Sequence, residues 1–177
     1  TVNLSGGEPT LHPEFLAFCD LARRPEISRV SVVTNGLRCA AEPEFCRELA
    51  RRRVYVNLQF DGPGDEALHA LRGGGDQLGA RRRALDNLEA AGVSTTIVAT
   101  IARGVNEDQV GALVRLLFER KFLLSLLFQP AAYTGTGGDT FGPHGPLDVV
   151  TLPEVVRRAA EQSGGLLRQS DFLPLPC

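Results

Sequence analysis

The sequence predicts an α/β fold in which about five parallel strands alternate with helices. Short runs of apolar and β-branched residues recur along the chain, and segments with helical spacing of their apolar residues separate them. Strands that are joined through helices pair in parallel, with right-handed crossovers. Every predicted strand is followed by a loop that contains glycine or a polar residue, which favours a barrel-like arc of loops around one site. An open doubly wound sheet is the alternative.

In the first half of the chain, three predicted strands alternate with two predicted helices. Pro13 suits the first turn of the first helix, and Phe15, Phe18 and Cys19 recur on one face of it. The β-branched run that starts at Val30 is typical of a buried strand. In chain order, the predicted strands and helices cover residues 1–4, 13–24, 30–33, 43–52 and 54–60.

In the second half, three predicted helices alternate with two predicted strands. Gly92 ends a long helix, and the strand after it is rich in valine, isoleucine and threonine. Val110, Leu113 and Phe118 lie at helical spacing in the next helix, and Asn106 is predicted to be its N-cap. In chain order, these elements cover residues 76–91, 93–101, 106–120, 123–128 and 152–162.

The composition is that of an ordinary globular protein, with 43% hydrophobic and 23% charged residues among 177. A net charge of −2 gives no reason to expect a nucleic-acid partner, and no apolar run reaches the ~18 residues of a membrane-spanning helix. The arginine runs 51–53 and 81–83 are predicted to be solvated. The four cysteines form no CxxC pair and no disulfide framework, which indicates a reducing cytoplasm.

The sharpest local signal is the segment SGGEPT at residues 5–10, directly after the first strand. Because Gly6 and Gly7 have no side chains, their backbone can approach a ligand closely or adopt positive φ. Glu8 adds a carboxylate at the carboxyl end of the strand, where it suits a cationic group such as an ammonium. A plain Gly-Gly turn beside a solvent-exposed glutamate is the alternative.

Residues 4–13, LSGGEPTLHP, closely resemble the GGEP segment of radical S-adenosylmethionine (SAM) enzymes. Three further segments resemble that family in the same order over residues 1–130: VVTNG at 32–36, LQFDG at 58–62 and ARGVN at 102–106. The resemblance implies a partial (β/α) barrel and an enzyme that cleaves SAM at a [4Fe–4S] cluster. The resulting 5′-deoxyadenosyl radical would abstract hydrogen from a substrate.

The resemblance also implies that the loop after the first strand binds SAM. Glu8 and the backbone of Gly6 and Gly7 would hold the methionyl amino group. Pro9 would fix the direction of the chain as it leaves this loop.

Other candidate SAM contacts lie at the ends of later strands. Gln59, where many members carry serine, and Asp61 would bind ribose hydroxyls or shape the turn. Thr100 and Arg103 would bind the SAM carboxylate or a substrate anion, because guanidinium groups pair well with carboxylates. Asn35 and Gln129 could face substrate or adenine. For Asn35, a role in the turn is the alternative.

The family's CxxxCxxC motif, which holds the cluster, is absent from these 177 residues. We expect the motif to precede Thr1, so that the chain is an inactive fragment of a larger enzyme; the lack of methionine agrees with this. Residues 128–135 and 174–177 resemble lipid-modifying members of the tetraether-lipid-synthase-like type, and a MoaA-like type is the other subfamily considered. In the first type, Cys177 would be a ligand of an auxiliary cluster.

The predicted organisation is a core over residues 1–130 and a C-terminal region over 131–177. The resemblance implies a small-molecule or lipid substrate and a reductant protein such as flavodoxin or ferredoxin. A degenerate, non-catalytic (β/α) barrel that binds a nucleoside or an amine is the alternative function. A Schiff-base aldolase is disfavoured because the single lysine, Lys121, lies at a helix end. A phosphate-binding doubly wound fold is also disfavoured, because no predicted strand is followed by the glycine-rich motif that binds phosphate.

Overall fold

The structure is a computed structural model that describes residues 1–64, 70–71, 77–132 and 149–174. Within these residues, each strand pairs in parallel with the next one along the chain. Spatial order therefore equals chain order, as in a (β/α) barrel, whereas a doubly wound sheet reverses its order at one point. This confirms the predicted arc. The strands are β1 (Val2–Leu4), β2 (Val30–Thr34), β3 (Tyr55–Gln59), β4 (Thr95–Ile101) and β5 (Leu123–Pro130).

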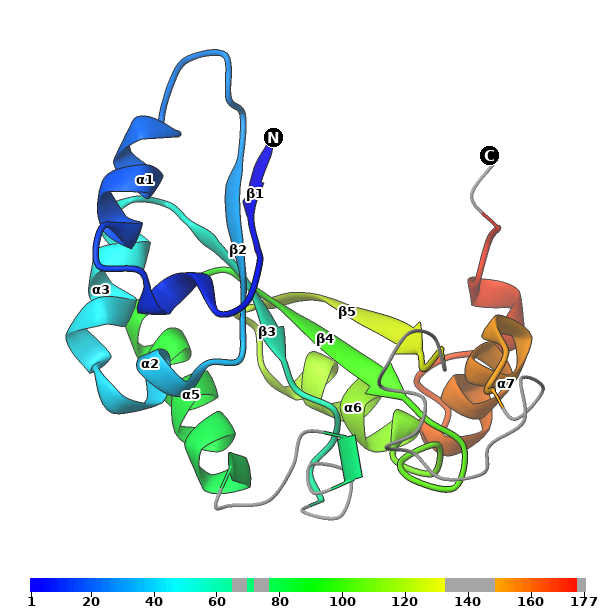
Figure 1. The fold of residues 1–177 in the computed structure, drawn as a ribbon. Helices are drawn as coiled ribbons and strands as arrows, with labels where there is room; N and C mark the ends of the chain where they lie inside the picture. Colours follow the sequence, from blue (N-terminus) through cyan, green and yellow to red (C-terminus); the bar gives the residue numbers. More distant parts are fainter. Residues whose placement is uncertain (65–69, 72–76, 133–148, 175–177) are drawn as a thin grey trace.

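Helices connect the strands and cover one face of the curved sheet (Figure 1). The side of the sheet that lies between the two chain ends in this view carries no helix of the described chain. The described helices are α1 (Phe15–Leu21), α2 (Leu37–Ala41), α3 (Pro43–Arg51), α5 (Gln77–Ala91), α6 (Val110–Glu119) and α7 (Leu152–Gln162). The single 3-10 turns are η1 (Pro9–Leu11) and η3 (Gln169–Asp171).

The hydrophobic core fills the space between the sheet and the helices. Alternate side chains of the central strands point into it, as strand geometry requires. Burial of an aliphatic side chain stabilises a fold by about 1.5–3 kcal/mol. This packed layer therefore holds the strands in place, and with them the positions of the strand ends. Core residues that are at most 2% exposed include Val32, Val56, Leu58, Leu85, Leu88, Ile97, Ile101 and Leu113.

Two helix assignments differ from the sequence prediction. Helix α6 begins at Val110 with Gln109 as its N-cap, so the predicted capping role of Asn106 is wrong. The short helix α2 was not predicted, because the Asn35-Gly36 pair that precedes it indicates a turn.

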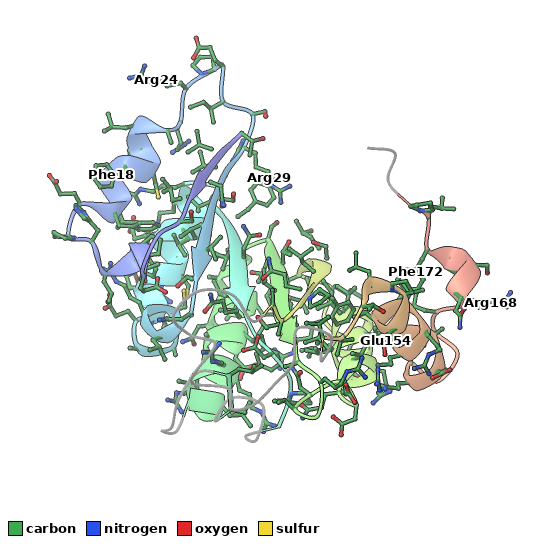
Figure 2. The ribbon with its side chains drawn as sticks, turned by 45° about the vertical axis from the view of Figure 1, so that its right-hand side comes forward. Phe18, Arg24, Arg29, Glu154, Arg168 and Phe172 are labelled. Carbon is green, nitrogen blue, oxygen red and sulfur yellow. The ribbon has the colours of Figure 1, made fainter. Side chains whose placement is uncertain are left out.

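Three side chains also differ from expectation. Arg81, expected to be solvated, is 2% exposed, and its Nη1 donates to the Gln59 carbonyl at 2.5 Å. Phe18 and Phe118 were expected on apolar faces, but they are 40% and 55% exposed. Figure 2 shows Phe18 on the side of α1 that points away from the sheet. Helical spacing thus identified the buried stripe but overestimated its width.

The C-terminal part of the described chain packs on α6 through α7. Thr151 caps α7 in a capping box with Glu154. The division of the chain at residue 130 stays a prediction, and Cys177 lies outside the described residues. Among the described residues, no helix has the length and apolar character needed to cross a membrane.

Candidate functional site

The carboxyl ends of the parallel strands form one rim, and the predicted site residues lie along it. Glu8 follows β1, Asp61 follows β3, and Arg103 follows β4. The sheet register pairs Thr100 of β4 with Gln129 of β5. Hydrogen bonds join the loops after β1 and β2 and, separately, the loops after β3 and β4, as described next. The parallel strands thus bring the strand-end candidates to a common edge.

The Gly6–Gly7 loop is the open part of this rim. Gly6 has φ of 133°, a value that residues other than glycine rarely adopt. A Cβ atom built on either glycine meets no other heavy atom within 4 Å. Gly7 has no positive φ, so neither space nor backbone conformation demands glycine there. Its open backbone is available for the close approach of a ligand.

Glu8 joins the loop after β1 to the loop after β2. Its Oε1 accepts hydrogen bonds from the backbone N–H of Thr10 at 3.2 Å, the Thr10 hydroxyl at 2.6 Å and the Thr34 hydroxyl at 2.7 Å. Its Oε2 accepts one from the backbone N–H of Asn35 at 2.7 Å. A carboxylate offers about four lone-pair positions, two on each oxygen. Oε2 therefore retains the capacity to accept from a ligand.

The Asn35-Gly36 turn starts α2. Asn35 Oδ1 accepts from the backbone N–H of Leu37 at 2.9 Å, which is the turn role considered for it. Gly36 has φ of 80°, and a Cβ there would lie 2.5 Å from Cδ1 of Leu58. Glycine is therefore required at this position by both conformation and packing. A contact of Asn35 with substrate or adenine stays a prediction.

Buried polar groups join the ends of β3 and β4. Asp61 is fully buried, and its Oδ1 accepts from the backbone N–H of Thr100 at 2.8 Å. Asn106 is also fully buried, and its Nδ2 donates to the carbonyls of Asp61 at 2.8 Å and Thr100 at 2.7 Å. Its Oδ1 accepts from the backbone N–H of Ala102 at 2.9 Å. Asp61 thus shapes the turn, and Asn106 is a site residue that sequence reasoning missed.

Arg103 is directed toward α7. Its Nη2 donates to both carboxylate oxygens of Glu154, at 2.9 and 3.0 Å, and to the Val149 carbonyl at 2.8 Å. The hydrogen bond from the Thr151 backbone, followed by that from Arg103, lowers the pKa of Glu154 to about 2. Figure 2 shows Glu154 on α7, at the side of the sheet where β4 ends. The contact of Arg103 with a SAM or substrate carboxylate stays a prediction.

The model of the radical SAM superfamily matches residues 1–117. The chain belongs to the radical SAM superfamily. The match covers the four segments in which the sequence resembles that family, from the Gly6–Gly7 loop to the turn that contains Asn106.

The curated relatives of this radical SAM chain are enzymes. The 7,8-dihydro-6-hydroxymethylpterin dimethyltransferase of Methanocaldococcus jannaschii is 28% identical over 99% of the chain and 34% of its own length. A GTP 3′,8-cyclase of Klebsiella pneumoniae is 30% identical over 89% of the chain and 47% of its own length. The mycofactocin maturase MftC of Mycobacterium ulcerans is 36% identical over 62% of the chain and 29% of its own length. The chain thus spans less than half of each relative.

A solved structure of a radical SAM protein shows the same fold. The structure of native anSMEcpe with bound AdoMet and the Kp18Cys peptide aligns with a TM-score of 0.61. The alignment covers 92% of this chain and 44% of that one, at 20% sequence identity. At this level of identity the likeness supports the partial-barrel fold.

The family implies two cofactors, SAM and a [4Fe–4S] cluster, and the described residues fit only the first. The Gly6–Gly7 loop leaves open space next to Glu8 Oε2, which suits the methionyl amino group. For the cluster, the described residues contain no group of three His, Cys, Asp or Glu side chains that could hold a metal. Cys19, Cys39 and Cys46 are free thiols buried in the core.

Two of the buried thiols, Cys19 and Cys39, are also poorly suited to ligation because their pKa values are raised, which favours the protonated form. Burial is the main cause that raises the pKa of Cys19 to about 11. A hydrogen bond with Cys46, followed by burial, raises the pKa of Cys39 strongly. Since iron is bound by thiolates, Cys19 and Cys39 are poor ligands. The hydrogen bond with Cys39 lowers the pKa of Cys46, but Cys46 is buried in the core, where its Sγ donates to the Cys39 carbonyl at 3.6 Å.

Proposed function

We propose that this chain supplies the SAM-binding rim and the substrate-facing sheet of a radical SAM enzyme. The observation that carries the proposal is the open Gly6–Gly7 backbone beside a glutamate oxygen that can accept one more hydrogen bond. When bound, SAM supplies the deoxyadenosyl group for hydrogen abstraction from the substrate. The residues of this chain bind SAM, orient it and present the substrate.

The contacts of Glu8 give it two tasks at this rim. Its Oε1 ties Thr10 and Thr34 together, which fixes the position of the loop after β1. Its Oε2 and the carbonyl groups of Gly6 and Gly7 accept hydrogen bonds from the methionyl ammonium group. Charge-assisted hydrogen bonds of this kind are roughly twice as strong as neutral ones, so the ammonium fixes the orientation of the whole cofactor.

The other rim residues act on the rest of the cofactor or on the substrate. Gln59, Thr100 and Gln129 lie on the helix-free face at the carboxyl ends of β3, β4 and β5, where they bind ribose or substrate. Asp61 shapes the loop that holds them. Arg103, bound to Glu154, would contact an anion only if that ion pair opened or were shared.

Several parts of the proposal concern the whole enzyme. Without three thiolates among the described residues, these 177 residues are not expected to bind the [4Fe–4S] cluster or cleave SAM alone. A reductant protein such as flavodoxin or ferredoxin would supply electrons, in the cytoplasm, where buried free thiols persist. Cys177 as an auxiliary-cluster ligand belongs to the same proposal. The sequence resemblance suggests either a small-molecule or a lipid substrate.

A second candidate function is a non-catalytic barrel that binds a nucleoside or an amine. The observation that favours it is the combination of a complete rim with a described chain that offers no cluster ligands. Anaerobic reconstitution of the whole protein with iron and sulfide, followed by assay of 5′-deoxyadenosine, separates the two, because only a radical SAM enzyme forms this product. In the same assay of the chain alone, stoichiometric 5′-deoxyadenosine would contradict its proposed inactivity.

SAM binding to the rim is tested by Gly7→Ala and calorimetric titration with SAM. The substitution adds a methyl group where it meets no other heavy atom within 4 Å, so the fold is expected to persist and SAM binding to be lost. Ser170→Ala on η3 is the control, because Ser170 is exposed and lies away from the rim. Equal SAM affinity of Gly7→Ala and the wild-type chain would contradict the proposal.

A further inference from the structure

The face of the sheet that carries no helix is lined mainly by uncharged polar side chains. None of the strand residues that the structure describes is charged. Valine and leucine occupy only a few positions on this face, at Val33, Val98 and Leu127. The polar residues of the helix-free face are Asn3, Ser31, Tyr55, Asn57, Gln59, Thr96, Thr100, Ser125 and Gln129.

Strand alternation and register place these side chains on one face. Successive side chains of a strand point to opposite faces, and the partners of the core residues point to the helices. The register pairs Asn3 with Ser31, Asn57 with Thr96, and Thr96 with Ser125. These five residues, one from each strand, define what we term the polar row.

Hydrogen bonds within the polar row support this placement. The Ser31 hydroxyl donates to Asn3 Oδ1 at 2.9 Å, and Asn57 Nδ2 donates to the same oxygen at 3.5 Å. The hydroxyls of Thr96 and Ser125 are 2.8 Å apart. Asn3 and Ser125 are exposed, and Asn57 and Thr96 are half-buried. Ser31 is buried at 7% exposed, so the accessible part of the row is formed by the other four residues, whose side chains keep hydrogen-bonding capacity.

The polar row differs from the usual filling of a barrel. Barrel interiors are normally packed with branched aliphatic side chains. Covering amides and hydroxyls with hydrocarbon is unfavourable for each group that loses its hydrogen bonds. A lipid chain on this face would incur that cost at several positions. A charged group would find no opposite charge on the described strands.

A cation, Arg29, lies close to this face at its amino-terminal end. The guanidinium of Arg29 stacks on the ring of Tyr55, 3.9 Å from the ring centroid. Figure 2 shows Arg29 beside the beginning of the strands, at the end away from the rim. The polar row lies between this pair and the rim residues Gln59, Thr100 and Gln129.

We propose that the polar row binds the substrate, and that the bound part of the substrate is an uncharged heterocycle with amide-type donors and acceptors. This inference rests on the proposed function, because it takes the rim as the SAM site. The side-chain amide of Asn57 presents a donor next to an acceptor, which matches the edge of a cyclic amide. The hydroxyls of Thr96 and Ser125 can donate or accept around it.

The test is NMR titration of the ¹⁵N-labelled chain with hypoxanthine, an amide-bearing heterocycle, and separately with 1-hexanol as a hydrocarbon probe. We expect hypoxanthine to shift the amide signals of Asn3, Asn57 and Ser125, and hexanol to leave them unchanged. No shift with hypoxanthine, or a larger shift with hexanol, overturns the inference.

Variants establish which residues bind. Asn57→Leu is expected to weaken hypoxanthine binding by about tenfold or more. Thr96→Val, which keeps the side-chain shape, is expected to weaken hypoxanthine binding less than Asn57→Leu does. It replaces Asn57→Leu as the test variant if that protein fails to fold. Ser170→Ala on η3 is the control and should bind as the wild-type chain does. Unchanged affinity in a folded Asn57→Leu or Thr96→Val variant overturns the inference.

SAM added to the same sample separates this inference from the proposed function. SAM is expected to shift the amide signals of Gly6 and Gly7. If SAM shifts them and hypoxanthine does not bind, the substrate class is wrong and the proposed function stands. If SAM leaves them unchanged, the proposed function itself fails.

Discussion

Replacing Asn106 with alanine removes three hydrogen bonds that join the ends of β3 and β4. Asn106, Asp61 and Ala102 are buried and Thr100 is half-buried, so the carbonyls of Asp61 and Thr100 and the N–H of Ala102 each lose a hydrogen bond, two of them in buried surroundings. A buried hydrogen bond contributes about 1 kcal/mol net, and an abandoned buried group costs about 1–3 kcal/mol. The free energy of unfolding is therefore expected to fall by about 3–5 kcal/mol.

Urea denaturation followed by circular dichroism measures this loss. The midpoint should fall while the dependence on urea concentration stays the same, because the surface exposed on unfolding is similar. Asn35→Ala is the matched control, since it removes one exposed hydrogen bond at the start of α2 and should cost about 1 kcal/mol or less. A loss below about 1 kcal/mol for Asn106→Ala would refute the account of Asn106 as the link between these strand ends.

Two further predictions concern the contacts of α7. Gly111→Ala should lower the free energy of unfolding by about 1–3 kcal/mol in the same assay, because its Cβ would overlap the Gln162 carbonyl where α6 meets α7. A loss no larger than that of Ser170→Ala, at an exposed position, would contradict this close contact. The pKa of Glu154 is lowered from 4.5 to about 2 in the folded chain, so its contribution to stability is present above pH 4.5 and is lost as the pH falls toward 2. Glu154→Gln should therefore lose less stability than the wild-type chain over this range in urea titrations, and identical pH profiles would contradict the role of the Thr151 and Arg103 hydrogen bonds.

The order of strands and helices could be predicted because it depends on local patterns. The β-branched runs, the helical spacing around Val110 and Leu113, and the glycine after α5 are all visible over a few residues. The resemblance to a known family added the order of the loops and the role of the Gly6–Gly7 segment. The match over residues 1–117 confirms the family, and the role of the Gly6–Gly7 segment stays a prediction.

The contacts that build the site could not be predicted, because they depend on register between distant segments. Glu8 meets Thr34 and Asn35 only because β1 and β2 lie side by side in parallel. In the same way, Arg81 reaches the Gln59 carbonyl only because α5 packs on β3, although a run of three arginines is typical of a solvated face.

Asn106 shows how a correct motif can be interpreted with the wrong role. An asparagine four residues before Val110 is typical of a helix start, and its spacing alone predicts a cap. In the structure, one more turn of chain separates it from α6, and its side chain meets the carbonyls of Asp61 and Thr100. Burial, which depends on the whole fold, decided between the two roles.

The most direct test of SAM binding at this rim is a crystal structure of the chain with SAM. The account predicts that the methionyl amino group lies within hydrogen-bond distance of the carbonyl oxygens of the Gly6–Gly7 loop and of Glu8 Oε2. SAM bound at another place in the chain, or a Gly6–Gly7 loop without SAM at saturating concentration, would contradict the account.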